Sequence, residues 1–273
     1  MSMRYDCRDP QMRTAGIDAA VTAARGGELI VLPTDTVYGI GADAFTPSAV
    51  ITMLAAKGRG RNMPPPVLVG TARAAAALVD DLGAFGQDLI DEFWPGALTL
   101  VFRASPTLLW DLGDTKGTVA LRMPLHAVAL DVLKQTGPLA VSSANRHGQP
   151  SATSADEAEQ QLGEAVSVYL DGGPCADNVP STILDLTGTI PKVLRTGAIS
   201  VDRLRAVSSV IAENEHYAEN AGSPADGSAA ERGAAERGVA GHSAADFKPA
   251  APHPLQGSGG SLDPATGEPP SGA

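Results

Sequence analysis

Apolar positions along residues 1–212 follow two periodicities, one typical of helices and one typical of short buried strands. Ile17, Ala20 and Ala24 lie on one helical face, and a Gly-Gly pair follows as the expected end of that helix. The next apolar run, 29–32, is short and continuous, which indicates a buried strand. The chain is therefore predicted to open with a helix followed by a strand.

The same alternation continues along the chain. Thr46 and Pro47 predict the N-cap and first turn of a helix that runs to Lys57. Further helices are predicted at 71–79, 84–93, 126–135, 154–162 and 200–211. Further strands are predicted at 67–69, 98–102, 119–123, 139–142, 166–170, 182–186 and 193–195. Helices that alternate with strands indicate an α/β fold, here a single sheet domain over 1–212.

The composition changes near Glu213. Residues 213–273 are rich in Ala, Gly, Ser, Pro and Glu and contain almost no large apolar side chains, so we predict a disordered tail. The tail holds nine acids and three bases, a net −6 of the chain's −11, which leaves −5 for 1–212. More than half of the net negative charge therefore lies outside the predicted domain.

Two features bear on the compartment. No apolar run approaches the roughly 20 residues of a membrane-spanning helix, and the first residues lack the apolar core of a signal peptide. Cys7 and Cys175 are the only cysteines, too few for a disulfide framework or a four-cysteine zinc site. We expect a cytoplasmic protein that does not bind membranes.

Positive charge is concentrated in one stretch, 44–79, which has no Asp or Glu. Its cations are Lys57, Arg59, Arg61 and Arg73. Cations at the end of a helix are ordinarily stabilised by the helix dipole, which is one explanation for Lys57 and Arg59. The prolines at 64–66 stiffen the following loop, and fixed cations also suit phosphate oxygens. Both explanations remain open, and no Walker motif is present.

Arg122 and Arg195 raise a similar question, because each interrupts an apolar strand and must find an anion or an acid. An internal ion pair with an acid such as Asp171 or Asp185 would satisfy them, and so would an anionic ligand. The residues alone leave both possibilities open.

Two classes of protein are disfavoured. Gly39, Gly41 and Ala44 match a dinucleotide-binding pattern, but the acid required about 20 residues later is missing, so we predict that the glycines serve a tight turn and close backbone packing. Ser142 and Ser143 follow a strand without the nucleophile elbow of hydrolases. Only two histidines in 1–212 could act as a base, which argues against a serine hydrolase.

Six motifs occur together in order. They are PTDTVYG at 33–39, KGR at 57–59, FWPGALT at 93–99, ALRMP at 120–124, SAN at 143–145 and STI at 181–183. In this order and spacing they resemble the YrdC-like threonylcarbamoyl-AMP synthase family over about 28–200, nearly the whole predicted domain. The resemblance implies a twisted mixed α/β sheet with a large cationic cavity, in a short, single-domain form.

The resemblance also implies an activity. Members form threonylcarbamoyl-AMP and pyrophosphate from L-threonine, bicarbonate and ATP, for N6-threonylcarbamoyladenosine at position 37 of tRNA. The carbamate of threonine attacks the α-phosphorus of ATP, so no protein nucleophile is needed. Mg²⁺ is expected with the ATP, no organic cofactor is implied, and a separate tRNA-modifying transferase is the expected partner.

The resemblance also implies a role for each residue that matches a functional position of the family. Lys57 and Arg59 would be catalytic. Threonine would contact Thr36, Arg122, Ser143 and Ser181. ATP would contact Arg59, Asn62, Thr118, Asn145, Thr153 and Arg195. No protein side chain is implied as a metal ligand.

One position departs from the family pattern. The family has a threonine-contacting histidine where this sequence, two residues longer, has Gly70, so we expect a space and one donor fewer beside threonine. Two rival functions share the fold. A non-catalytic RNA-binding module would also use a cationic cavity, whereas carbamoyl-transfer domains of hydrogenase maturation carry zinc-binding cysteine pairs that this sequence lacks.

Overall fold

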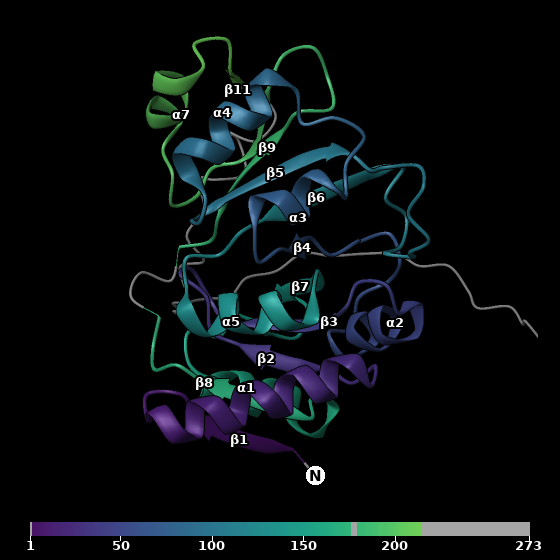
Figure 1. Cartoon of the computed structure of the whole chain (residues 1–273), viewed down its shortest axis with the longest axis vertical. Helices are drawn as coiled ribbons and strands as arrows, with labels where there is room; N and C mark the ends of the chain where they lie inside the picture. The colour runs from purple at the N-terminus through teal and green to yellow at the C-terminus, as the bar shows by residue number, and fades with distance from the viewer. Residues whose placement is uncertain (1, 176–178, 214–273) are drawn as a thin grey trace, which may run out of the picture. The chain divides into compact units, whose positions relative to one another are not determined.

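A mixed β-sheet runs through residues 2–175 and 179–213, the part of the chain that the computed structural model describes (Figure 1). The tail predicted for 213–273 lies outside these residues except for Glu213, which pairs with Val193 at the end of the sheet. The predicted disorder of the tail therefore stays a prediction.

The described residues form one sheet in the order β1-β8-β2-β3-β7-β4-β6-β5-β9-β10-β11. Its strands are β1 (Met3–Asp6), β2 (Ile30–Leu32), β3 (Gly39–Asp43), β4 (Val67–Leu68), β5 (Leu98–Arg103), β6 (Thr118–Arg122), β7 (Leu139–Ser143), β8 (Val168–Asp171), β9 (Thr182–Asp185), β10 (Lys192–Arg195) and β11 (Ala212–Glu213). The pairs β1/β8, β2/β8, β4/β6, β5/β9 and β10/β11 are parallel, and the other pairs are antiparallel. The expected mixed α/β sheet is confirmed.

The helices connect these strands. They are α1 (Pro10–Arg25), α2 (Pro47–Ala56), α3 (Ala72–Ala76), α4 (Gly83–Phe93), α5 (Ala127–Thr136), α6 (Ala155–Leu162) and α7 (Val201–Val207), with a short 3₁₀ helix at Gly163–Ala165. In Figure 1, α1 and α5 lie side by side over the strands around β2. Helices α2 and α6 also pack on this part of the sheet, α2 on β3 and α6 on β2 and β8.

Strands in the middle of the sheet are buried on both faces. In β2, Ile30 and Leu32 pack in the apolar cluster that includes α1 and α5, whereas Val31 packs in the other, larger cluster. The same alternation separates Leu139 from Ala140 in β7. Burial on both faces explains why these strands are continuous apolar runs in the sequence.

Local signals fix the helix ends. The Asp9 side chain accepts hydrogen bonds from Gln11 N and Met12 N, both at 2.9 Å, and so caps α1. Helix α2 begins at Pro47 as expected, but the Thr46 hydroxyl does not cap it and instead donates to Asp43 Oδ2 at 2.8 Å. The boundary was predicted correctly, and the capping interaction was not.

Three elements differ from the prediction. The tight turn predicted at Gly39 and Gly41 is wrong, because both residues lie in the extended strand β3. Their close packing is confirmed, since a Cβ on Gly39 would lie 2.6 Å from Val141 Cγ1. The predicted helix 200–211 ends at Val207, and the short strand β11 follows. The pattern also missed β1, which is mostly exposed and therefore carries no apolar run.

Candidate active site

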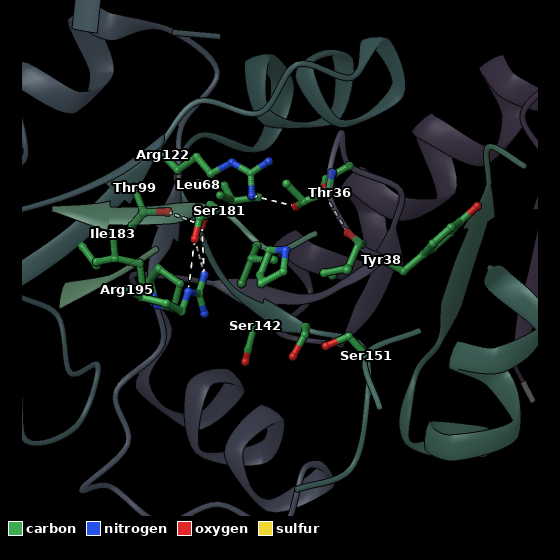
Figure 2. Close-up of a pocket in the computed structure, with 18 of the residues that line it drawn as sticks. Thr36, Tyr38, Leu68, Thr99, Arg122, Ser142, Ser151, Ser181, Ile183 and Arg195 are labelled. Atoms are coloured by element: carbon green, nitrogen blue, oxygen red, sulfur yellow. Dashed lines mark hydrogen bonds between the residues drawn. The ribbon is translucent and has the colours of Figure 1, made fainter. Parts of the chain in front are cut away.

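A cavity of about 380 Å³ lies where side chains from six strands, β4 to β7, β9 and β10, meet residues of four loops (Figure 2). Three arginines line it, namely Arg59, Arg122 and Arg195, together with a set of Ser and Thr hydroxyls. No Asp, Glu, His or Cys is among the lining residues within the described ranges. The cavity is therefore cationic, and its wall offers hydroxyls rather than a nucleophile and base.

The loop between β2 and β3 aims Thr36 into the cavity. Thr34 Oγ1 accepts a hydrogen bond from Thr36 N at 3.1 Å and donates to Val37 O at 2.6 Å, which folds 33–38 into a tight polar turn. The next residue, Tyr38, is fully buried, and its hydroxyl donates to Gly173 O at 2.5 Å. In Figure 2 the Tyr38 ring points away from the cavity, so it anchors the loop rather than facing a ligand.

Arg122 is held by contacts on three sides at the end of β6. Its Nη2 lies 2.6 Å from Asp35 Oδ1, its Nη1 donates to Thr36 Oγ1 at 2.9 Å, and its Nε donates to Gly96 O at 2.9 Å. Burial lowers the pKa of Arg122, and the Asp35 carboxylate opposes that shift. The three contacts orient the guanidinium beside the cavity.

The ion-pair partner of Arg122 is not one of the acids considered from the sequence. Asp171 pairs with Arg4 at 2.5 Å, and Asp185 accepts a hydrogen bond from Thr187 Oγ1 at 2.7 Å. The expected internal ion pair is therefore confirmed for Arg122, but its acid is Asp35 and not Asp171 or Asp185. Arg122 both pairs with Asp35 and lines the cavity, so an internal ion pair and an anionic ligand do not exclude each other.

Ser181 and Arg195 form a second polar group on the wall. Ser181 Oγ lies 2.8 Å from Thr99 Oγ1, and Arg195 Nη2 donates to Ser181 O at 2.7 Å. Arg195 Nε donates to the same carbonyl at 3.1 Å. Strand β10 therefore delivers its arginine to the start of the neighbouring strand β9, beside the cavity (Figure 2).

Arg59 is the third lining cation, and it is only loosely held. Its Nη1 donates to Ser142 Oγ at 3.2 Å, whereas its Nε is buried without a hydrogen-bond partner in the described part of the chain. Burial lowers the pKa of Arg59. An under-satisfied buried guanidinium on a cavity wall is suited to bind an anion.

Lys57 lies close to Arg59 in sequence but does not line the cavity. It is fully buried, and its Nζ donates to Asn145 O at 2.6 Å and to the carbonyl of Ser143. Burial lowers the pKa of Lys57 to about 7, and the Arg59 charge adds to the effect. The structure thus places Lys57 as a support for the Ser143–Asn145 turn rather than in contact with the cavity.

Four other expected ATP contacts lie off the cavity wall. The Asn145 side chain donates to Gln149 O at 2.7 Å, and Thr118 Oγ1 donates to Thr115 O at 2.8 Å. Thr153 Oγ1 donates to Glu157 Oε2 at 2.9 Å, and Asn62 is exposed on its loop. Of the expected residues, the structure brings together Thr36, Arg59, Arg122, Ser143, Ser181 and Arg195.

Gly70 does not leave a space beside the cavity. A Cβ at this position would lie 3.0 Å from Lys134 N and 3.1 Å from the carbonyl carbon of Leu133, in the backbone of α5. The expectation of a space there is wrong, because helix α5 packs directly onto the glycine. Gly70 lies two residues beyond β4, whose residue Leu68 does line the cavity.

Some lining hydroxyls were not predicted. They are Thr34, Thr99, Ser142 and Ser151. Thr34 and Ser142 adjoin predicted residues and could have been found from their strand ends. Thr99 closes the FWPGALT motif at 93–99, but a threonine inside an apolar strand is common, so the motif alone did not show that it lines the cavity beside Ser181.

A mixed sheet with a cationic, hydroxyl-lined cavity is an arrangement suited to a small anionic ligand. The family model Sua5_yciO_yrdC, described as telomere recombination, matches residues 22–197. This chain belongs to the Sua5/YciO/YrdC family.

Relatives and solved structures agree with this assignment. A Mycobacterium tuberculosis protein, provisionally named a threonylcarbamoyl-AMP synthase, is 53% identical over 212 residues, 78% of this chain and 98% of its own length. The threonylcarbamoyl-AMP synthase of Bacillus subtilis is 37% identical over 73% of this chain, which spans 57% of that longer relative. The structure of Pyrococcus abyssi Sua5 complexed with L-threonine matches with a TM-score of 0.72 and 32% identity, over 78% of this chain and 62% of that one.

None of the helices in the described ranges is long and apolar enough to cross a membrane.

Proposed function

We propose that this protein is an L-threonylcarbamoyladenylate synthase, which forms threonylcarbamoyl-AMP and pyrophosphate from L-threonine, bicarbonate and ATP. The observation that carries the proposal is the cavity itself, with three arginines and no acid among the described residues of its wall, in the fold of a protein solved with L-threonine. Three cations suit a substrate pair that brings a carboxylate and a triphosphate.

The proposed reaction uses groups that the substrates supply. Bicarbonate takes up a proton and loses water to give carbon dioxide. The threonine amine adds to it and releases a proton, which balances the one taken up, and a carbamate remains. A carbamate oxygen then attacks the α-phosphorus, a P–O bond forms, and the bond to the β-phosphate breaks to release pyrophosphate. The wall, as far as the described residues form it, contains no histidine or cysteine, and the attack needs no protein nucleophile because the carbamate is itself the nucleophile.

Each arginine has a proposed role. Arg122 would bind the threonine carboxylate, because its guanidinium is pre-oriented by Asp35 and Gly96 O at 2.6 and 2.9 Å. Arg59 and Arg195 would stabilise the charge that builds on the phosphates during attack. Thr36, Ser143 and Ser181 would bind the polar groups of threonine.

Three ATP contacts proposed by resemblance, from Asn62, Asn145 and Thr153, require the bound nucleotide to extend beyond the cavity described above. Thr118 also lies off the cavity wall, so a contact with ATP would require the same extension of the nucleotide. Lys57 would act through the Ser143–Asn145 turn that it holds, since its Nζ lies 2.6 Å from Asn145 O. These roles rest on position in the family motifs.

Mg²⁺ would enter with the triphosphate. The described residues contain no group of three or more His, Cys, Asp or Glu that could hold a metal ion, and Mg²⁺ is commonly bound through substrate phosphates. A tRNA-modifying transferase in the cytoplasm would then receive the adenylate and use it on tRNA.

The test is pyrophosphate release by the purified protein. We expect release to require both threonine and bicarbonate, because the attacking carbamate is made from them. Equal release without threonine would overturn the proposal, and stimulation by many amino acids would indicate a general adenylating enzyme. Salt-sensitive RNA binding without ATP turnover would favour the RNA-binding alternative.

A further inference from the structure

An ion pair joins the loop that carries Arg59 to a second loop. The Arg59 loop, residues 58–66, connects α2 with β4, and the β5–β6 loop covers residues 104–117. Arg61 Nη1 and Nη2 donate to the two carboxylate oxygens of Asp111 at 2.9 and 2.8 Å. This parallel two-bond geometry restricts both the distance and the orientation of the loops.

The backbone adds to the same contact. Asp114 N donates to Arg61 O at 2.8 Å, so Arg61 is bound through both its side chain and its carbonyl. Gly113 makes this approach possible, because it has φ +102° and a Cβ there would lie 2.6 Å from Arg61 O. Asp111 Oδ1 also accepts a hydrogen bond from Gly113 N at 3.0 Å, which orients the carboxylate toward Arg61.

The β5–β6 loop is itself anchored to the domain. Leu112, between the two acids that contact Arg61, is 2% exposed and belongs to the larger apolar cluster. Trp110 stacks on Phe45 with ring centroids 5.5 Å apart. Asp111 is therefore a fixed point to which the Arg59 loop is tied.

The Arg59 loop would be flexible without this contact. It supplies Arg59, Pro64 and Pro66 to the cavity wall. Gly58, at φ +67°, and Gly60 flank Arg59 and allow many backbone conformations. Arg61 follows directly, so its bonds to Asp111 and Asp114 limit the positions that Arg59 can reach.

We propose that Asp111 is a positioning residue, which through Arg61 holds the Arg59 wall of the cavity in the geometry that binds ATP. The ATP part of this inference rests on the proposed function. The restraint on the Arg59 loop is independent of the proposed function, because it is a property of the chain without ligand. Arg61 and Asp111 side chains are 50% and 38% exposed, so their ion pair contributes little to global stability and its loss should leave the fold intact.

The variants are Asp111→Asn, Arg61→Lys and the double substitution. Asparagine keeps the shape of the side chain without its charge, and lysine keeps the charge without the two-pronged geometry. Asp131→Asn is the matched control, because Asp131 is 40% exposed and pairs with Arg13 at 2.5 Å between α1 and α5. All four proteins are compared as full chains with the wild type.

Two measurements decide the inference. Hydrogen exchange of the backbone amides at 59–63, without ligand, should be faster in the Asp111 and Arg61 variants and unchanged in the control. The dissociation constant for ATP should rise about fivefold in each single variant and no further in the double, because both changes break one contact. Threonine affinity and the melting temperature should match the control.

Unchanged exchange at 59–63 would overturn the inference whatever happens to ATP binding. Faster exchange with unaltered ATP affinity would overturn the positioning role, as would an equal loss of affinity in Asp131→Asn. Failure of the wild type to bind ATP would instead overturn the proposed function, while the exchange measurement would still decide whether Asp111 restrains the loop.

Discussion

Asp35 Oδ1 lies 2.6 Å from Arg122 Nη2 and also accepts a hydrogen bond from Leu125 N at 2.9 Å. One carboxylate oxygen therefore ties the loop before β3 to the arginine at the end of β6 and to the segment that follows it. The cation is oriented before a ligand arrives, which reduces the entropy lost when a substrate carboxylate binds.

Arg122→Ala should abolish the dependence of pyrophosphate release on threonine. It should also lower the free energy of unfolding by about 3 kcal/mol, because the Asp35 charge would lose its buried partner. Adding Asp35→Asn to Arg122→Ala removes the stranded charge and should restore stability without restoring threonine dependence. Threonine titrations and chemical denaturation check both effects. An unchanged threonine requirement in Arg122→Ala would show that the carboxylate binds elsewhere.

Arg59→Ala and Arg195→Ala should each slow turnover by roughly 10- to 100-fold, since a hydrogen bond to a charged group contributes about 1.5–3 kcal/mol. The melting temperature of Arg59→Ala should change little, because the buried Arg59 Nε has no partner among the described residues that its removal would strand. Arg25→Ala is a suitable control, since this exposed side chain donates to Gln135 O away from the cavity lining. A destabilised variant with normal turnover in its folded fraction would contradict the phosphate role.

Gly70→His should destabilise the protein and should not create a threonine contact. A Cβ there would meet the α5 backbone at 3.0 Å, and neither the segment after β4 nor the helix can move without disturbing the core. Gly188→His is the control, because the nearest atom to a Cβ at that exposed position is 3.8 Å away. Melting temperatures of the two variants give the comparison. A fully stable Gly70→His protein with tighter threonine binding would mean that the side chain reaches the cavity.

Lys57 should make stability depend on pH above neutrality. Burial lowers its pKa in the folded protein to about 7, against 10.5 for an ordinary lysine. Between these values the unfolded chain binds a proton that the folded chain lacks, so the free energy of unfolding should rise with pH. Below the pKa of Lys57 in the folded protein, the side chain is charged in both states and its contribution to the free energy of unfolding is lost.

Lys57→Met removes this group, so the rise between about pH 7 and about pH 10 should disappear. Denaturation of wild type and Lys57→Met across that range, with Lys134→Met as an exposed control, measures the difference. Parallel stability curves for wild type and Lys57→Met would show that Lys57 keeps an ordinary pKa.

The sequence predicted most directly the strands that are buried on both faces. Strands such as β7 are continuous apolar runs because both faces are covered, and the run predicts them directly. Strand β3 could not be recognised in this way. Its glycines lack the side chains that mark a strand, and their extended conformation is imposed by close packing on Val141 in the neighbouring strand.

The cavity was predictable at strand ends and less so elsewhere. Arg122 and Arg195 stand out because a cation in an apolar strand requires a partner. The separation of Lys57 from Arg59 could not be foreseen, since two residues around the end of α2 point in different directions once the helix stops. The Lys57 ammonium turns inward to Asn145 O, and Arg59 reaches Ser142.

The order of strands in the sheet has a thermodynamic consequence. Thr36 and Arg122 meet on the cavity wall although β2, which leads to Thr36, and β6 are separated by three other strands. No short fragment of the chain can therefore contain a working pocket, and forming one requires the long-range contacts that make folding slow. A ligand that binds the pocket stabilises the native state as a whole, by about 2.7 kcal/mol at a hundred times its dissociation constant. Saturating ATP or threonine should therefore slow unfolding-dependent hydrogen exchange even in strands such as β8 that supply no side chain to the cavity lining.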